Sequence, residues 1–190
     1  MNTGRRYLGR SGTQTSALGF GGDSDGTNGT ALTEEYNGTN WTEVNDTNTA
    51  RRNAAASGSS TSSLYYGGDT PIFAVTELWN GTNWTEVGDL NSARRGLAGS
   101  GVDNTAALAF GGTTSGADYN TLTEEYNGTN WTEVADLATA RTVLGGAGAA
   151  STSSLAFGGN ISPGFSASTE EWTGAGAPVG AWSTGGNLNT

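Results

Sequence analysis

The feature that most constrains the fold of this chain is a fourfold repeat marked by glycine doublets. The doublets are separated by 46, 44 and 47 residues. Within the repeat, residues 32–44 (LTEEYNGTNWTEV) return letter for letter at 122–134, and a near-copy lies at 75–87. A period in the forties is typical of propeller blades and of helical arrays. The doublets are Gly21-Gly22, Gly67-Gly68, Gly111-Gly112 and Gly158-Gly159.

The composition of the repeat distinguishes these two architectures. Helical arrays need Ala, Leu, Glu and Lys at 3.6-residue spacing, whereas these units hold short alternating segments rich in Gly, Thr, Ser and Asn. In the second unit we expect four strands, at about 51–59, 63–68, 75–80 and 84–89, which make one blade. The chain is therefore predicted to be an all-β protein, a β-propeller of four four-stranded blades. Residues 1–190 form one domain, with blades at about 4–46, 50–89, 93–136 and 140–190.

Aromatic residues recur at fixed places in every unit, which favours a packed core over a disordered chain. Because side chains alternate along a strand, the Glu and the aromatic residue of each Glu-x-aromatic triplet share a face. A blade cannot cover its own faces, so we expect these aromatic residues to bury the contact between neighbouring blades. They are Tyr36, Trp79, Tyr126 and Trp172 in the triplets, and Trp41, Trp84, Trp131 and Trp182 after the turns.

The segment YNGTNW is predicted to form the tight turn between the two outer strands of a blade. Its Asn-Gly pair is expected to supply the positive φ angles of such a turn, and the neighbouring Thr and Asn to bond to nearby backbone.

With its glycine doublet, Tyr, Trp and Arg at set spacing, the unit resembles the kelch repeat. The matching strings are YYGGD, LTEEYNGTNW and SARRGLAGSG, and the resemblance covers essentially the whole chain. It implies a propeller fold but no particular function, because propellers host enzymes, adaptors and structural proteins. The GTNW segment is also similar to the Asp-box turn of sialidase-type propellers, although the Asp of that box is absent.

Ring closure has two alternatives. Kelch propellers usually have five to seven blades and share one blade between the chain ends. Here Thr190 follows Trp182 at the spacing that separates Thr49 from Trp41, so we expect blades 1 and 4 to meet through side chains alone. The chain is then either a monomer whose four blades close, or half of an eight-bladed ring formed by a homodimer, because an open half exposes two blade faces. Small residues in the inner strands favour the ring of four.

A repeated Arg opens each inner strand and is the most informative polar residue. Fourfold repetition is expected to bring Arg5, Arg51, Arg94 and Arg141 to one mouth of the channel. Guanidinium groups bind carboxylate and phosphate through paired hydrogen bonds. The string ARRGLAG is also similar to the strand of a kelch adaptor whose Arg residues hold an acidic peptide.

The alternative is structural: each of these Arg residues pairs with the repeated Glu of its unit, which is Glu34, Glu77, Glu124 or Glu170. The next residue is Arg6, Arg52 and Arg95 in three units but Thr142 in the fourth, which favours ligand contact for Arg52 and Arg95.

The loops after the doublets vary most between units, and recognition commonly resides in such loops. Phe73, Tyr119 and Phe165 are expected there either to stack on a sugar or peptide or to cover the blade edge. Asp23 and Asp25 in DSDGTNG look like the start of a calcium loop. The remaining ligands are missing, so an Asx-rich turn is favoured and neither metal nor cofactor is expected.

Composition excludes several functions. The chain has no Cys and no His, so it lacks thiolate chemistry, the usual neutral general base and the ligands of kelch-fold copper oxidases. A formal net charge of −10 disfavours nucleic acid, and no apolar run suits a membrane span or signal peptide. We expect a non-catalytic propeller that binds protein, acidic peptide or glycan. The alternatives are a structural part of a phage virion or cell-surface assembly, and a designed or consensus-like propeller. The sequence indicates no compartment.

Overall fold

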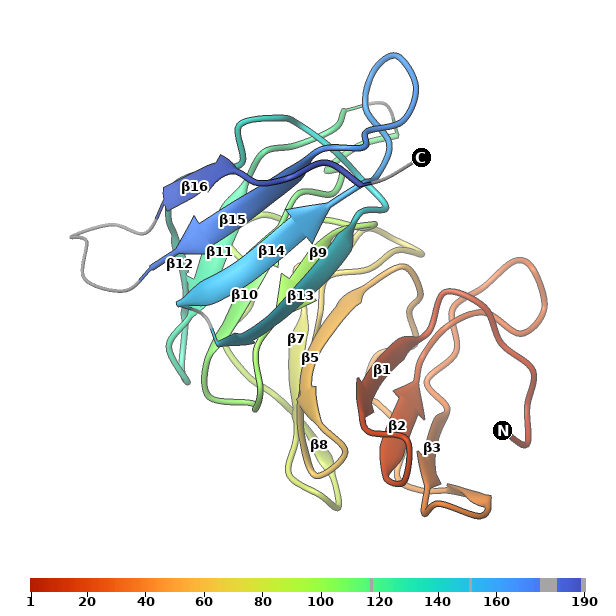
Figure 1. Ribbon diagram of the computed structural model, residues 1–190. Coiled ribbons are helices and arrows are strands. Elements are labelled where there is room, and N and C mark those ends of the chain that lie inside the picture. Colours follow the sequence, from red (N-terminus) through yellow and green to blue (C-terminus); the bar gives the residue numbers. More distant parts are fainter. Residues whose placement is uncertain (117, 151, 175–180, 189–190) are drawn as a thin grey trace.

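The computed structural model describes residues 1–116, 118–150, 152–174 and 181–188 (Figure 1). All regular structure in these ranges is β, and it forms four four-stranded antiparallel sheets. In each sheet the strand order follows the chain, so every sheet is one contiguous stretch of sequence. These sheets are blades 1 to 4 of a β-propeller. Thr190 lies outside the described residues, and the described part has no helix that is long and apolar enough to cross a membrane.

Every blade runs from an inner strand at the axis to an outer strand at the rim. Blade 1 consists of β1 (Gly9–Gly12), β2 (Ala17–Phe20), β3 (Thr33–Tyr36) and β4 (Trp41–Glu43). Blade 2 consists of β5 (Ala55–Ser59), β6 (Ser62–Tyr66), β7 (Thr76–Trp79) and β8 (Trp84–Glu86). Blade 3 consists of β9 (Ala98–Ser100), β10 (Ala107–Phe110), β11 (Thr123–Tyr126) and β12 (Trp131–Glu133). Blade 4 consists of β13 (Gly145–Ala150), β14 (Ser153–Phe157), β15 (Thr169–Thr173) and β16 (Ala181–Thr184).

The inner strand of blade 2 is shorter than the sequence predicts. In blade 2 the strand begins at Ala55 and not at Arg51, because Asn53 has a φ of 53°, in the left-handed region that ends an extended segment. Tyr7 and Val143 take the same conformation, with φ of 56° and 53°. This bend could not be predicted from residue type, since only Asn among these residues is common in the left-handed region.

The bend has a function in assembly, because it turns one backbone N–H of each blade toward the preceding blade. Asn53 N donates to the carbonyl oxygen of Tyr7 at 3.1 Å. Gly96 N donates to Asn53 O at 2.8 Å, and Val143 N donates to Gly96 O at 2.7 Å. A ladder of backbone hydrogen bonds therefore joins blades 1, 2, 3 and 4 in order near the axis.

The YNGTNW turn differs from the prediction in the role of its Asn. Only the glycine has a positive φ, 92° at Gly38. The Asn37 side-chain oxygen instead accepts the backbone N–H groups of Thr39 and Asn40, both at 3.0 Å. Asn thus closes the turn through its side chain, and the copies in blades 2 and 3 do the same.

Each blade has two different faces, which we name the Trp face and the Thr face. The Trp face carries the Trp of the outer strand and the aromatic residue opposite it on the third strand, for example Trp84 and Trp79 in blade 2. The Thr face carries the first Thr of the third strand with the aromatic residue opposite it, for example Thr33 and Phe20 in blade 1. Because the two faces differ, blades pack in one direction only, each Trp face on the preceding Thr face.

The joint between blades 1 and 2 shows how these faces fit. The ring of Trp84 lies edge-on to Phe20, with centroids 4.8 Å apart. Its indole N–H donates to the hydroxyl of Thr33 at 3.1 Å, so the one polar atom of the buried ring is satisfied. The same bond recurs at the next two joints, from Trp131 to Thr76 at 2.9 Å and from Trp182 to Thr123 at 3.1 Å.

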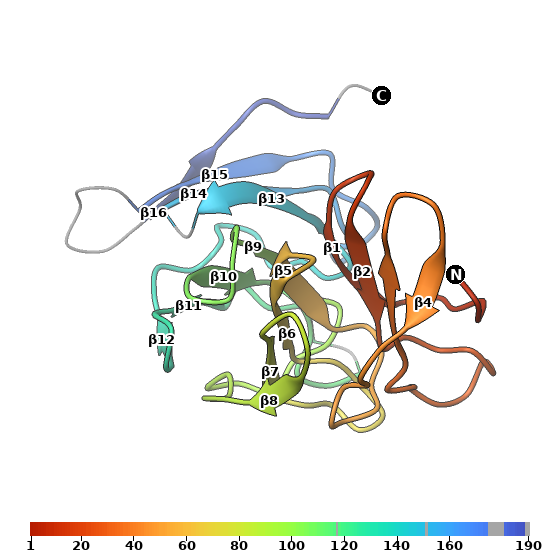
Figure 2. The same cartoon turned by 90° about the horizontal axis from the view of Figure 1, so that it is seen from below.

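The core of the described chain is divided among these joints. One cluster of buried apolar residues lies between blades 1 and 2, a second between blades 2 and 3, and a third between blades 3 and 4. The inner strands contact one another in the order β1, β5, β9, β13, with no comparable contact between β1 and β13 in the described ranges. Blades 1 and 4 are therefore the two ends of an arc (Figure 2).

Small residues in the inner strands have a reason other than a narrow ring of four. At Gly99 of β9 an added Cβ would overlap the hydroxyl of Tyr66, a side chain of the preceding blade. The Tyr66 hydroxyl donates to Leu108 O at 3.2 Å across this strand. A small residue at Gly99 is thus required because Tyr66 of the preceding blade reaches across this strand.

Candidate functional site

The first repeated Arg of each unit lies inside its blade and not at the channel mouth. The side chains of Arg5, Arg51, Arg94 and Arg141 are fully buried, and each forms an ion pair with the Glu of its own unit. The N···O distances are 2.9 Å for Arg5–Glu34, 2.5 Å for Arg51–Glu77 and 2.8 Å for Arg94–Glu124; Arg141 pairs with Glu170. These side chains are not accessible to a ligand.

The paired Glu also fixes the chain connection into each blade. In blade 3, Glu124 accepts the backbone N–H and the side-chain amide of Asn91, at 2.6 and 2.9 Å. In blade 1, burial opposes ionisation of Glu34, but the N–H groups of Asn2 and Thr3 together with Arg5 outweigh it and lower its pKa. Burial lowers the pKa of Arg94, and Glu124 acts in the opposite direction. The pair is a structural element that links one blade to the next.

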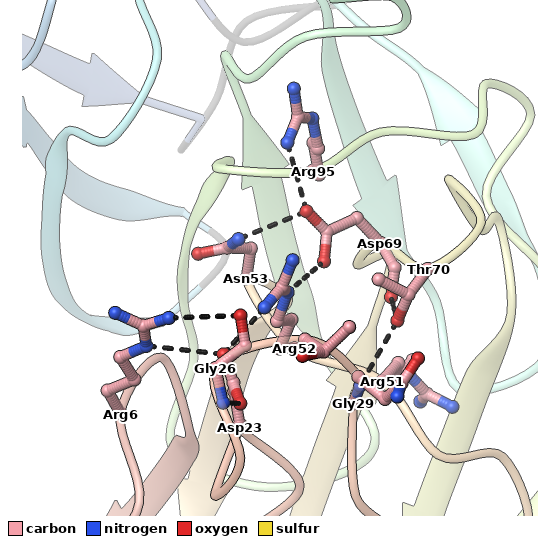
Figure 3. Close-up of polar contacts among 12 residues, drawn as sticks. Arg6, Asp23, Gly26, Gly29, Arg51, Arg52, Asn53, Asp69, Thr70 and Arg95 are labelled. Atoms are coloured by element: carbon pink, nitrogen blue, oxygen red, sulfur yellow. Dashed lines mark hydrogen bonds and ion pairs between the residues drawn. The ribbon is translucent and has the colours of Figure 1, made fainter.

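The second Arg of units 1 to 3 does lie at the mouth, where these three residues form a continuous series of ion pairs with two Asp residues (Figure 3). Arg6 Nε donates to Asp23 at 3.2 Å, and Arg52 Nη1 donates to the same carboxylate at 2.6 Å. Arg52 Nε reaches Asp69 at 3.1 Å, and Arg95 Nη1 reaches Asp69 at 3.0 Å. Each Arg after the first thus bridges from its own blade to the Asp of the preceding blade.

This series of ion pairs has one more cation than anion, because three guanidinium groups share two carboxylates. In unit 3 the position after the doublet is Thr113, and in the described residues Arg95 forms no ion pair with a carboxylate of its own blade. Its Nε–H is buried and finds no hydrogen-bond partner in the described part of the chain. Arg6 and Arg95 each share their one carboxylate with Arg52, and Arg95 differs in this unpartnered Nε–H; its side chain remains 36% exposed.

Arg95 is one of the residues that line a cavity of about 450 Å³ at this mouth. Arg6, Arg52 and Asp69 line it on the charged side. The other walls supply an amide, hydroxyls and phenol rings, from Asn53, Thr113, Thr142, Tyr119 and Tyr7. Such a combination of cations, neutral donors and aromatic rings suits a small ligand that carries a carboxylate or a similar oxyanion.

Asp23 is the most strongly perturbed carboxyl of the mouth. Burial opposes its ionisation, but hydrogen bonds from Gly26 N–H, Arg52 and Arg6 outweigh burial and lower its pKa to about 2. The hydrogen bond with Asp23 is also the main cause of a raised pKa at Arg52. Both groups therefore stay charged over the range in which proteins are usually studied.

The two Asp residues of the DSDGTNG loop bind backbone and arginine. Asp23 accepts the N–H groups of Asp25 and Gly26, at 3.1 and 2.7 Å. Asp25 accepts those of Thr27 and Asn28, at 2.8 and 2.9 Å. The loop is two consecutive Asx turns, and the described residues include no group of three or more acidic, His or Cys side chains placed to hold a metal.

The three loop aromatics occupy different environments. Tyr119 lines the mouth cavity beside Arg95. Phe73 is half-buried, and its backbone is fixed to the blade edge by hydrogen bonds to Gly68 and Arg94. Phe165 is 84% exposed on blade 4. Only Tyr119 is therefore placed next to the charged mouth.

The sequence prediction missed Asp69 and Asn53. Asp69 holds Arg52, Arg95 and the Asn53 amide together. A signal was present, because the residue after the glycine doublet is Asp in units 1 and 2, which precede units that carry the second Arg, and is Thr113 in unit 3, which precedes the unit that carries Thr142. The covariation within one chain pointed to a contact between these positions.

No protein-family model matches this chain, and no curated protein matches it significantly. The likeness to kelch units accordingly rests on the repeated residues alone.

Proposed function

We propose that this kelch-like propeller is a non-catalytic binding protein that holds a carboxylate-bearing ligand at the channel mouth. An acidic peptide is the preferred candidate, and a carboxylated glycan offers the same chemistry. The observation that carries the proposal is Arg95, whose charge is neutralised only by an Asp69 that it shares with Arg52. In a protein with a net charge of −10, this mouth is a local attraction for anions.

Charge balance supports the choice of an anion. The buried Arg–Glu pairs are matched one to one and need no further partner, whereas the mouth has three cations for two anions. Arg95 offers a buried Nε–H beside a part-exposed guanidinium edge. A ligand carboxylate that accepts a hydrogen bond from the exposed part of this guanidinium supplies a further counter-charge.

The test is calorimetric titration of the protein with a hexaglutamate peptide and, separately, with a sialylated trisaccharide. Arg95→Gln is expected to weaken binding by about 10- to 100-fold, since a hydrogen bond to a charged group contributes about 1.5–3 kcal/mol. Arg10→Gln is the charge-matched control, because Arg10 lies outside the mouth cavity. Absence of binding to both probes, or equal losses for the two variants, would refute the proposal.

Removal of the internal competitor gives the opposite change. Asp69 occupies Arg95 in the free protein, and Asp69→Asn releases that guanidinium. Tighter binding of hexaglutamate by Asp69→Asn, together with weaker binding by Arg95→Gln, would locate the ligand on the Arg95 edge.

A further inference from the structure

The Thr face of blade 4 is uncovered, although it carries the same residues as the covered Thr faces. Leu155 is 39% exposed, whereas its counterparts Leu64 and Leu108 are fully buried. Phe157 and Thr169 are half-buried, whereas the corresponding Phe110 and Thr123 are enclosed by Trp182 of the next blade. The described chain supplies no blade to cover this face.

At the other end of the arc, the Trp face of blade 1 is also uncovered. Tyr36 and Trp41 stack on each other with centroids 5.3 Å apart but remain half-buried. A cavity of about 510 Å³ lies along the inner strands and reaches Trp41 and Leu8 on this face. Both ends of the arc therefore present a joint surface without its partner.

The two ends of the arc each carry one half of the hydrogen bond that joins neighbouring blades elsewhere. At three joints a Trp indole donates to a Thr hydroxyl of the preceding blade. In the described ranges, the indole N–H of Trp41 and the hydroxyl of Thr169 have no such bond. Among the described residues, the N–H of Tyr7 and the carbonyl of Val143 likewise have no partner in the backbone ladder, which ends at these two groups.

The two open faces fit each other, because the molecule already contains both halves of the joint. Blade 1 shares residues 32–44 letter for letter with 122–134 of blade 3, and the blade 3 copy packs its Trp131 on Tyr66 of blade 2. The Thr face of blade 4 repeats the Leu-x-Phe and Thr of blade 3, which bury Trp182. Each of the two open faces thus has a counterpart in the molecule that is packed on a face of the complementary kind.

We propose that a second copy of this chain covers both faces and completes an eight-bladed ring. Blade 4 of each copy would pack on blade 1 of the other, so the two joints are equivalent and the ring closes with twofold symmetry. The arrangement of the four blades supports this choice, since blades 1 and 4 are the separate ends of one arc in both views (Figures 1 and 2). A closed pair leaves neither face exposed.

The charged mouth adds an independent argument for the same joint. Arg52 and Arg95 each reach the Asp of the preceding blade and are 19% and 36% exposed. Arg6, which has no preceding blade, is 57% exposed. In the ring, Arg6 faces the position of Asn160 in blade 4 of the second copy, whose side-chain oxygen is an acceptor in the place of Asp23 and Asp69.

The test is sedimentation velocity of the full chain at several concentrations. We expect a species of twice the chain mass. Trp41→Ala on blade 1 and Leu155→Arg on blade 4 are each expected to leave a folded single chain, because each variant damages one side of both joints. Val102→Ala is the control, since Val102 is 54% exposed but lies on blade 3, away from both ends of the arc.

Circular dichroism and a thermal melt show whether each variant is folded, and the two variants probe opposite faces, so failure of one to fold leaves the other informative. A wild-type chain that stays single at all concentrations would overturn the proposal, as would an open series of three or more chains. A pair that survives Leu155→Arg but not Trp41→Ala would mean that Trp faces pack on each other, which also contradicts it. The outcome is independent of ligand binding at the mouth.

Discussion

Blades 1 and 3 carry the same outer hairpin, residues 32–44 and 122–134, and yet bury it to different extents. In blade 3, Tyr126 and Trp131 are only 1% and 4% exposed against blade 2. In blade 1, Tyr36 and Trp41 remain half-buried. Since the thirteen residues are identical, the difference comes entirely from the neighbour: burial in a repeat protein belongs to the joint between units.

The comparison also shows what does not depend on a neighbour. Glu34 in blade 1 is as deeply buried with its Arg as Glu124 in blade 3, with side-chain exposures of 3% and 2%. Interactions within a blade are therefore complete in both copies, whereas those between blades are complete only in blade 3. Four experiments test this division.

The largest expected difference comes from truncation of the two equivalent Trp residues. Trp131→Ala should reduce the free energy of unfolding by about 3–5 kcal/mol, as for a fully buried Trp. Trp41→Ala should cost less than half as much in the single chain, because Trp41 has no blade packed on it. Urea unfolding followed by circular dichroism measures both, in a Leu155→Arg background that keeps the chain single. Equal losses at the two positions would contradict the comparison.

Loss of the buried carboxylate should affect the two blades equally. Glu124→Gln leaves Arg94 buried without its counter-charge and should destabilise the chain by about 3 kcal/mol, near the lower end for a broken buried pair, because Gln retains one acceptor oxygen. Glu34→Gln should cost about the same. Glu125→Gln, one residue from the pair and without an ion pair in the described chain, is the control and should stay within about 0.5 kcal/mol. A much smaller loss for Glu34→Gln would show that blade 1 is loosened as a whole.

A smaller effect should follow removal of the Thr hydroxyl that receives the indole bond. Thr76→Val leaves the buried N–H of Trp131 without an acceptor and should cost about 1–2 kcal/mol. Thr169→Val should cost nothing measurable in the single chain, because no Trp of the described residues donates to it. In the ring of eight the Thr169 variant should instead weaken association. Thermal melts at low and high protein concentration separate these two results.

The smallest effect should be a pH dependence at the mouth between blades 1 and 2. The folded-state pKa of Asp23 is about 2, below its ordinary value of 3.8, so its ionised form stabilises the fold. This contribution is complete above about pH 4 and is lost as pH falls toward 2. Asp23→Asn should therefore flatten the decline of Tm between pH 4 and pH 2.5, whereas Glu133→Gln, an exposed control, should not. If the Tm of Asp23→Asn declined as steeply as that of the wild type, the proposed contribution of Asp23 to acid sensitivity would be wrong.

The sequence was sufficient to predict the fold because the same period, doublet and aromatic positions occur four times. The pattern of any single unit is weak evidence, but all four copies predict the same strands, the same turn and the same buried face. The burial of the aromatic triplets follows from the same logic, since a blade has nothing else with which to cover its neighbour.

The site was harder to predict, because two adjacent Arg residues take opposite positions. Arg51 points into its blade and Arg52 into the mouth, and the left-handed Asn53 then turns the chain into β5. Period and composition give no information on that bend. The bridging of Arg52 to Asp23 of another blade depends on the angle between blades, which no local pattern encodes.

Ring closure was also beyond the sequence for a geometric reason. Small inner-strand residues suit a narrow ring, but they are equally required where Tyr66 lies across Gly99. The same small inner-strand residues are therefore compatible with a closed ring of four blades and with a more open arc. Only the arrangement of whole blades distinguishes the two.

The indole placed at every blade joint gives this chain a built-in optical signal. Emission from an indole enclosed in apolar surroundings lies at shorter wavelength than emission from one in contact with water. Trp84 and Trp131 are already shielded from water in the single chain. Trp41 is half-buried, so its emission would shift to shorter wavelength when a second arc covers it. Assembly of the ring could then be followed in an unlabelled protein, in real time, through light that the repeat itself emits.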